Sequence, residues 1–330
     1  MPTAFVTGAT GFVGHHVAEA LLRRGWGVKA LRRASSVHPA QLPGVEWIEG
    51  DLRDPRRLTS AIHGADAVFH VAADYRLWAK NPREIYESNV NGTVNVLRAA
   101  LSAGVDGVVY TSSVGALGLK PDGTPADETT PVAFGDMVGH YKKSKFLAER
   151  EAEKFLDKGL RVFFVHPSTP IGPGDHKPTP TGKIIVDFLN RKMPAYIDTG
   201  LNLADVRDVA EGHCLAFERG RPGEKYILGN RNLGLSEIFD LLEKISNLPA
   251  PKIRLPYTPI YCLAGFFYLL SFVTRREPLI PFEGVRMAKK HMFFNPAKAV
   301  RELGLPQTPI ETALSDAVAW FYEHGYVSKI

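Results

Sequence analysis

Short apolar runs alternate with helical patterns through the first half of the chain. Apolar runs predict strands over residues 4–7, 28–32, 45–48, 67–72, 107–112 and 161–166, and helical spacing predicts helices over 11–24, 55–63, 84–103 and 139–158. Alternation of this kind is typical of a parallel sheet with helices on both faces. The sequence therefore predicts an α/β fold with a Rossmann-type doubly wound parallel sheet.

The rhythm of the pattern changes after His166. Prolines at positions 167, 170, 173, 178 and 180 predict irregular backbone in this region. The later segments are mixed, with helices predicted over 184–192, 235–246 and 310–324 and a strand over 225–228. We therefore expect a first domain over residues 1–166. A smaller mixed α/β domain that binds the substrate takes up most of 167–330, with later segments returning to the first domain.

Three glycines stand where the first predicted strand passes into the first predicted helix. Gly8 allows a tight turn, Gly11 lets the backbone approach a pyrophosphate, and Gly14 permits close packing of the helix on the strand. The helix N-terminus adds free N–H groups and a partial positive charge. This placement predicts a dinucleotide-binding loop. Its expected cofactor contacts are Gly8, Thr10, Gly11, Phe12 and Val13.

The end of the second predicted strand bears on the choice of dinucleotide. NAD sites usually carry an acidic residue there for the ribose 2′-hydroxyl, but this strand ends in Arg32 and Arg33. Two guanidiniums can grip a 2′-phosphate, so the sequence favours NADP(H), with NAD(H) as the alternative. Asp51, which Leu52 follows, comes after the third strand and can accept a hydrogen bond from the adenine amino group.

Tyr141 and Lys145 lie four residues apart, on one face of a predicted helix. An ammonium beside a phenol lowers the pKa of the phenol from about 10, so Tyr141 is a candidate proton donor and acceptor near neutral pH. The helix comes after the strand that leads to Ser113, and ligands bind at the carboxyl ends of parallel strands. We therefore expect Ser113 to hold a substrate carbonyl against Tyr141; its alternative role is to cap the following turn.

Composition and net charge exclude some classes of protein and of binding partner. The 330 residues are 45% hydrophobic and 23% charged, which is enough apolar material to exclude global disorder. A formal net charge of +5 suits an anionic ligand or a membrane surface but is too small to indicate a nucleic-acid partner. Two cysteines without zinc spacing predict reduced thiols and no bound metal. Because the N-terminus shows no signal-peptide pattern, we expect a cytoplasmic protein.

With the glycines, Ser113 and the Tyr141–Lys145 pair in this order, the chain resembles the extended short-chain dehydrogenase/reductases over nearly its whole length. The resemblance implies that Asn89 supports the active-site geometry and that Asp208 is a structural acid. It also implies that Ala72, Ala73, Pro167 and Ser168 lie beside the cofactor. Residues 70–78, 177–183, 193–200 and 284–290 resemble the bacterial hopanoid-associated sugar epimerases, which neighbour the dihydroflavonol-reductase-like enzymes. Residues 205–207 depart from that group, where His or an aromatic residue more often precedes the acid.

The expected reaction is hydride transfer between a nicotinamide and a small-molecule carbonyl or alcohol, with Tyr141 as acid and base. Two alternatives stay open: an NAD-dependent nucleotide-sugar epimerase, and a catalytically silent cofactor-binding scaffold or sensor. A sugar dehydratase is disfavoured because residues 111–113 lack the Asp–Glu pair that elimination needs. Candidate substrate contacts are Tyr75, Trp78 and Thr179.

An uncharged stretch separates Arg254 from Arg275. Its residues 260–274 are strongly apolar and would form a helix about 22 Å long, short of a bilayer core of about 30 Å. Three interpretations stay open: a buried or substrate-covering helix, an interfacial membrane helix and a membrane span. Peripheral membrane contact would suit a lipid-linked or polycyclic substrate, in line with the implied role in hopanoid lipid metabolism. The resemblance also implies a homodimer formed through the helices over 84–103 and 139–158.

Overall fold

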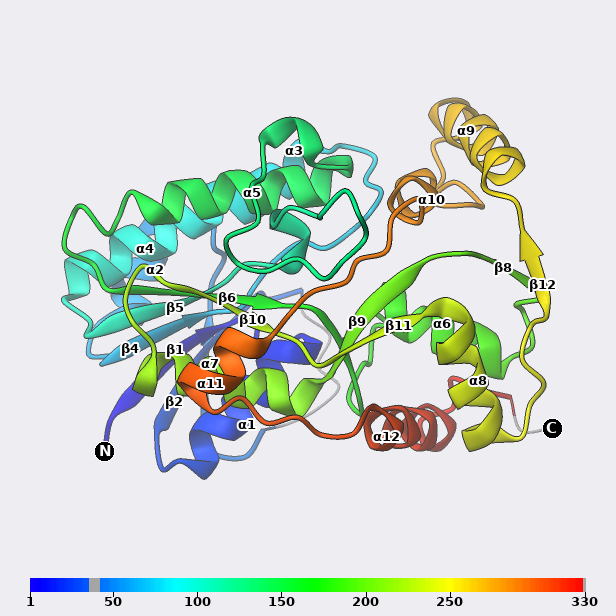
Figure 1. The fold of residues 1–330 in the computed structure, drawn as a ribbon. Helices are drawn as coiled ribbons and strands as arrows, with labels where there is room; N and C mark the ends of the chain where they lie inside the picture. The colour runs from blue at the N-terminus through cyan, green and yellow to red at the C-terminus, as the bar shows by residue number, and fades with distance from the viewer. Residues whose placement is uncertain (36–41, 329–330) are drawn as a thin grey trace.

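The computed structural model describes residues 1–35 and 42–328, and its centre is a seven-stranded sheet (Figure 1). All neighbouring strands in this sheet run parallel. The order is β10 (Lys225–Leu228), β6 (Val162–Pro167), β5 (Gly107–Thr111), β4 (Ala67–His70), β1 (Thr3–Thr7), β2 (Gly27–Arg32) and β3 (Val45–Glu49). Three of the strands, β4, β5 and β6, are completely buried, as expected for a parallel sheet covered on both faces. The predicted α/β Rossmann-type fold is confirmed.

Helices cover both faces of this sheet (Figure 1). One face carries α1 (Phe12–Arg23), α7 (Val206–Arg219) and α11 (Ala297–Leu303), and the other carries α2 (Pro55–Ile62), α4 (Gly92–Ala103) and α5 (Gly139–Glu153). The helix predicted over 84–103 is continuous but not uniform. It begins as α3 (Arg83–Tyr86), passes through a π-helical turn at Glu87–Asn91, and continues as α4. A π-helical turn displaces side chains from the regular spacing, and π-bulges often mark functional sites.

Two elements from the second half of the chain complete the first domain. β10 pairs with the edge of β6, and α7 packs along α1. α7 was not predicted from the sequence, although Asp205 caps it by accepting a hydrogen bond from the Arg207 backbone N–H. Asp208 in its first turn accepts hydrogen bonds from the backbone and hydroxyl of Thr308, a structural role.

The second domain is built on smaller sheets. Its first sheet has the order β11 (Arg231–Gly234), β9 (Gly200–Asp205) and β7 (Thr169–Ile171), and its second pairs β12 (Ile253–Leu255) with β8 (Ala195–Ile197). Helices α6 (Pro180–Leu189), α8 (Leu235–Ser246) and α12 (Ile310–Glu323) pack against them around Phe188, Phe239 and Phe321. The expectation of irregular backbone in the proline-rich stretch 167–180 is wrong at β7. Pro170 is tolerated there because β7 is an edge strand.

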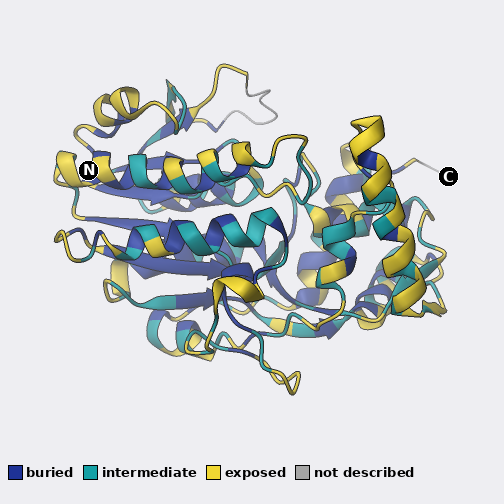
Figure 2. Cartoon of the chain, turned by 90° about the horizontal axis from the view of Figure 1, so that it is seen from above, coloured by how far each residue is buried: buried dark blue, intermediate teal, exposed yellow. Residues whose placement is uncertain are grey.

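The apolar stretch near the end of the chain forms α9 (Tyr257–Thr274), which α10 (Phe282–Met287) follows (Figure 1). Among the described residues, α9 is the one helix long and apolar enough to cross a membrane by length and composition. The interpretation of this segment as a buried helix is wrong, since only Ala264 and Ser271 of α9 are buried. Figure 2 shows most of α9 in the colours of exposed and intermediate residues.

Candidate active site

Backbone atoms lie so close to Gly8 and Gly14 in the glycine loop that larger residues do not fit at these positions. Gly8 has φ +80°, and a Cβ there would lie 2.6 Å from the backbone nitrogen of Ala72. A Cβ on Gly14 would lie 2.1 Å from the carbonyl oxygen of Gly8. Gly11 is the N-cap of α1 and brings no side chain to satisfy the first N–H groups of the helix. The loop therefore offers an anion a close backbone approach and open N–H donors, which fits a dinucleotide pyrophosphate.

A buried string of hydrogen bonds holds the exit of β4 beside this loop. The Thr7 hydroxyl bonds the Ala72 backbone N–H (3.2 Å) and pairs with Nδ1 of His70 (2.7 Å), whose Nε2 pairs with the Thr93 hydroxyl (2.9 Å). Burial lowers the pKa of His70 to about 3, so its ring stays neutral. Ala72 and Ala73, expected beside the cofactor, thus follow directly from a fixed strand end. Sequence reasoning missed the role of His70 and Thr93, which neither residue type reveals without the fold.

The residues expected at the adenosine end gather at the carboxyl ends of β2 and β3. Arg32 and Arg33 are both exposed there, one strand away from the glycine loop. Asp51 accepts hydrogen bonds from Nε (2.9 Å) and Nη2 (2.8 Å) of Arg53. These side-chain bonds are the main cause that keeps the pKa of Asp51 below its ordinary value. Leu52 packs on Gly92 of α4. The structure therefore gathers two cations and an ionised carboxylate at neighbouring strand ends, as expected for residues at the adenosine end of a dinucleotide site.

Ser113 and Tyr141 meet at the carboxyl end of β5. Ser113 caps a 3₁₀ turn, Val114–Ala116, by accepting a hydrogen bond from the Gly115 N–H (3.0 Å), and it also hydrogen-bonds the Tyr141 side chain. Burial raises the pKa of Tyr141 above 10, and the Ser113 hydrogen bond offsets this only in part. The expectation of a phenol made acidic by Lys145 is therefore wrong for this structure.

Lys145 lies behind the pair rather than against the phenol. Its Nζ donates to the Thr111 carbonyl (2.6 Å) and lies 4.8 Å from the ring centroid of Tyr110. Burial lowers the pKa of Lys145 to about 8, with the negative charge of Glu149 opposing that shift. Lys145 therefore holds its proton less tightly than an ordinary lysine but is still mainly protonated at pH 7.

Asn89 ties the loop after β4 to α5. Its side chain accepts from the Asp74 backbone N–H (2.7 Å) and donates to the Asp74 carbonyl and the Ser144 hydroxyl (both 2.9 Å). Ser144 in turn donates to the Tyr141 carbonyl (2.7 Å). The π-helical turn places Asn89 so that it can make these contacts, and Asn89 thereby positions the backbone that carries Tyr141.

Glu149, one helical turn beyond Lys145, is the centre of a buried network that sequence reasoning missed. Its carboxylate accepts from Ser112, from Nε2 of His166 (2.8 Å) and from Nζ of Lys225 (2.5 Å). Burial alone would raise the pKa of Glu149, but His166 and Lys225 together lower it below its ordinary value. A fixed negative charge therefore stands behind Lys145. The signal that could have found Glu149 is its spacing of four residues from Lys145.

The predicted substrate contacts have different surroundings. Tyr75 is exposed, and its hydroxyl reaches the Lys177 carbonyl at 3.5 Å, while Trp78 is half-buried. Thr179 is the N-cap of α6, where it accepts from the Gly182 N–H and is itself held by Asp175, so its hydroxyl has a structural role. On the cofactor side, Pro167 ends β6. The next residue, Ser168, has a buried hydroxyl without a hydrogen-bond partner in the described part of the chain.

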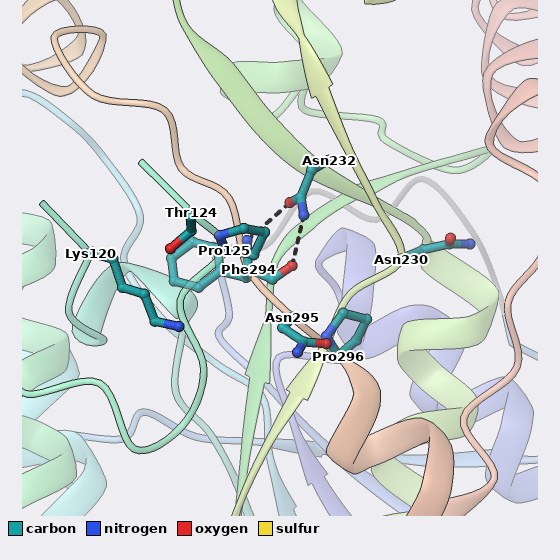
Figure 3. Close-up of a pocket in the computed structure, with 8 residues that line it drawn as sticks. All are labelled: Lys120, Thr124, Pro125, Asn230, Asn232, Phe294, Asn295 and Pro296. Carbon is teal, nitrogen blue, oxygen red and sulfur yellow. Dashed lines mark hydrogen bonds between the residues drawn. The ribbon is translucent and has the colours of Figure 1, made fainter. Parts of the chain in front are cut away.

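A pocket of about 420 Å³ lies apart from these groups, beside the segment that crosses from α10 to α11 (Figure 3). None of the predicted site residues lines it. Its lining residues are Lys120, Thr124, Pro125, Asn230, Asn232, Phe294, Asn295 and Pro296. Asn232 accepts from the Phe294 N–H and donates to the Phe294 carbonyl, both at 3.0 Å, so the amides fasten the crossing segment to β11.

Comparison with known proteins shows which family this chain resembles in sequence and in structure. The model of the NAD dependent epimerase/dehydratase family matches residues 4–229. A protein of Synechocystis named "Putative dihydroflavonol 4-reductase" is 48% identical over 98% of this chain and 95% of its own length. "Sterol demethylase protein B" of Methylococcus capsulatus is 33% identical over 98% of this chain and all of its own. The crystal structure of gox2253 superimposes with a TM-score of 0.89 at 46% identity, covering 99% of this chain and 100% of that chain.

The sheet, the glycine loop and the Ser113–Tyr141–Lys145 group define an NAD(P)-dependent enzyme of the short-chain dehydrogenase/reductase type. The chain belongs to the NAD-dependent epimerase/dehydratase family.

Proposed function

We propose that the protein is an NADP(H)-dependent reductase that converts a carbonyl group into an alcohol. The observation that carries this proposal is the hydrogen-bonded pair of Ser113 and Tyr141 at the carboxyl end of β5. Because burial raises the pKa of Tyr141, the phenol carries its proton at neutral pH. A protonated phenol is ready to donate, which is what the reductive direction requires.

The chain's own residues supply binding, orientation and the proton. The Ser113 hydroxyl and the Tyr141 phenol converge, so one substrate oxygen can accept hydrogen bonds from both. As negative charge develops on that oxygen, Tyr141 transfers its phenolic proton to it. NADPH, when bound, supplies the hydride for the carbonyl carbon. Lys145 provides a buried positive charge behind the phenol, and Asn89 fixes the helix turn from which Tyr141 projects.

Preference for NADP(H) over NAD(H) rests on the end of β2. Arg32 and Arg33 are exposed there, and that strand end carries no carboxylate for a ribose 2′-hydroxyl. Guanidiniums bind phosphate through paired hydrogen bonds, so an added 2′-phosphate gains contacts that NAD cannot make.

The substrate that we propose is a hydrophobic, lipid-linked or polycyclic carbonyl compound, such as hopanoid lipid metabolism would offer. Names of relatives support the reductive direction, since they include dihydroflavonol 4-reductase and cinnamoyl-CoA reductase. The relative named for sterol demethylation, at 33% identity, supports a polycyclic substrate.

The test is a turnover assay of the purified protein with candidate polycyclic and aromatic carbonyls and either NADPH or NADH. We expect one NADPH oxidised per alcohol formed. The double variant Arg32→Ser/Arg33→Ser should raise the KM for NADPH at least about tenfold and leave that for NADH unchanged. An epimerised product without net cofactor oxidation would replace the reductase with the epimerase alternative. Unchanged cofactor with every substrate class would favour the scaffold alternative.

A further inference from the structure

The outward face of α9 is apolar where a water-soluble protein usually presents polar side chains. Phe266, Leu269 and Phe272 are 61%, 67% and 66% exposed, and they lie one helical turn apart. Further exposed apolar residues on the same helix and just beyond it are Leu263, Leu270, Val273 and Leu279. A contiguous exposed apolar surface of this kind marks an interaction site.

The inward face of the same helix packs along a narrow seam against α10. Tyr261 and Tyr268 pack on the ring of Phe282 in α10, with ring centroids 5.3 and 5.2 Å apart, and the small residues Ala264 and Ser271 are buried on the same side. The larger and more hydrophobic side chains therefore point away from the protein. This is the reverse of an amphipathic surface helix, and it indicates an apolar environment outside the chain.

Helices α9 and α10 form a helical hairpin, and the residues at both of its ends pair with strands of the second domain. β12, which pairs with β8, ends at Leu255, two residues before α9 begins. After α10, Met292 bridges to Leu201 of β9. An 18-residue helix is about 27 Å long, close to a bilayer core of about 30 Å. The chain enters α9 from the second domain and returns to the same domain after α10. Helix α9 therefore cannot cross a bilayer while the rest of the chain keeps its fold.

The positive charge around this hairpin favours an anionic lipid surface as its binding partner. Residues 252–290 contain seven Lys and Arg and two Asp and Glu, a formal net charge of +5, which equals that of the whole chain. The remaining residues are therefore neutral by formal count. In the described part of the chain, Arg275, Arg276, Lys289 and Lys290 are exposed and have no carboxylate partner within ion-pair distance. A second copy of the chain on this face would bring like charges together, whereas an anionic lipid surface neutralises them.

We propose that α9 and α10 form a membrane-docking hairpin that inserts into the headgroup and upper acyl region of an anionic bilayer without crossing it. The docked hairpin lies close to the catalytic helix. Glu283 of α10 packs on Gly139, at the beginning of α5 and two residues before Tyr141. An apolar molecule dissolved in the bilayer would thus meet the protein near its active site. The docking itself does not depend on the proposed reaction.

Co-sedimentation of the full-length protein with vesicles tests this proposal. One vesicle type contains phosphatidylcholine alone, and the other contains an equal part of phosphatidylglycerol. We expect pelleting with the anionic vesicles and weaker pelleting with the neutral ones. The variant Phe266→Ser/Leu269→Ser/Phe272→Ser should reduce the partition coefficient at least about tenfold, and Arg275→Glu/Arg276→Glu should remove the preference for anionic lipid.

The matched control is Leu101→Ser/Val300→Ser, which changes exposed apolar residues on α4 and α11 and should pellet like the wild type. All of these positions are exposed, and unchanged melting temperatures would show that the variants fold. The proposal is overturned if the wild type stays in the supernatant with both vesicles. It is also overturned if the triple variant pellets like the wild type, or if light scattering shows a dimer that only the triple variant dissociates.

Cys262 gives an independent measure of depth, because it is exposed on α9 whereas Cys214 is buried. An environment-sensitive dye on Cys262 should shift to shorter wavelength when anionic vesicles are added. Lipid-borne quenchers near the headgroups should quench it more strongly than quenchers at the bilayer centre. Unshifted emission, or strongest quenching at the centre, would contradict interfacial insertion.

Discussion

At the scale of single residues, Tyr141 is held as a proton donor by burial. Sequence spacing correctly pairs it with Lys145 on one helix, but spacing carries no information about desolvation. In the structure, desolvation dominates and raises the pKa of the phenol, while the Lys145 ammonium is directed at the Thr111 carbonyl. Side-chain chemistry is thus predictable from the sequence, and the direction of a pKa shift is not. Glu149 escaped prediction for the same reason, since its role depends on burial and on His166 and Lys225 from distant strands.

The effect of burial on a pKa can also be tested at Asp175, through the free energy of unfolding. Burial raises its pKa from 3.8 to about 6, although Thr179 donates hydrogen bonds to it. Because the folded chain holds this proton more tightly than the unfolded chain, the stability that Asp175 contributes is fully present below about pH 4 and is lost as the pH rises through 6. Asp175→Asn keeps an acceptor for Thr179 and removes this loss. We expect the variant to unfold with about 1–3 kcal/mol more free energy than the wild type at pH 7.

Chemical denaturation at pH 7 and at pH 4 measures this difference, which should shrink toward zero at the lower pH. A variant that is equally destabilised at both pH values would show that Asp175 acts only through its contacts with Thr179.

At the scale of elements, the sequence predicts best where periodicity and burial agree. The strands of the parallel sheet up to β6 lie within about two residues of their predicted positions. The signal is strongest for β4, β5 and β6, because completely buried strands are largely continuous apolar runs. β7, β8 and β12 were missed because strands of three residues give no periodic signal. The longer strands β9 and β11 were missed as well. The start of α6 at Pro180 differs from the predicted start at residue 184, because proline both disrupts regular backbone and is favourable at the first helical position.

The junction of β1 and α1 makes a prediction at this scale. Gly14→Ala places a Cβ within 2.1 Å of the Gly8 carbonyl oxygen, so α1 must move away from the loop. We expect NADPH to bind at least about tenfold more weakly, with clear loss of stability, because the N–H groups of the helix no longer face the loop. Isothermal titration with NADPH and thermal melting measure the two effects.

The control for this variant is Gly135→Ala, because a Cβ at Gly135 meets no atom within 4 Å. It should bind NADPH like the wild type. Equal binding by Gly14→Ala and the wild type would remove the glycine loop from the cofactor site.

At the scale of the whole molecule, the first domain is built from two separate parts of the chain, because α7 and β10 return to it from the second half. α7 covers α1, with Arg24 paired to Glu211 (2.5 Å) and Glu218 (3.0 Å), and β10 completes the edge of the large sheet. The sequence predicted that later segments return to the first domain. Which segments do so could not be derived from local patterns, because α7 and β10 pack on elements that lie far away in the sequence. The predicted homodimer and the cytoplasmic location stay predictions.

This arrangement predicts that residues 1–166 alone do not fold. Without α7 and β10, the apolar faces of α1 and β6 would lie open to water. We expect the fragment to bind a hydrophobic dye strongly and to melt without a cooperative transition, whereas the full chain melts cooperatively. A fragment with a sharp transition and NADPH binding would contradict this view of the domain.

The proton-donor role of Tyr141 is tested most directly by the kcat of Tyr141→Phe for NADPH-dependent carbonyl reduction, measured at saturating substrate. The variant keeps the ring and removes only the phenolic hydroxyl group. The account predicts a fall in kcat of about 10²- to 10⁴-fold, with NADPH binding and melting temperature unchanged. A folded variant that reduces the substrate as fast as the wild type would contradict it.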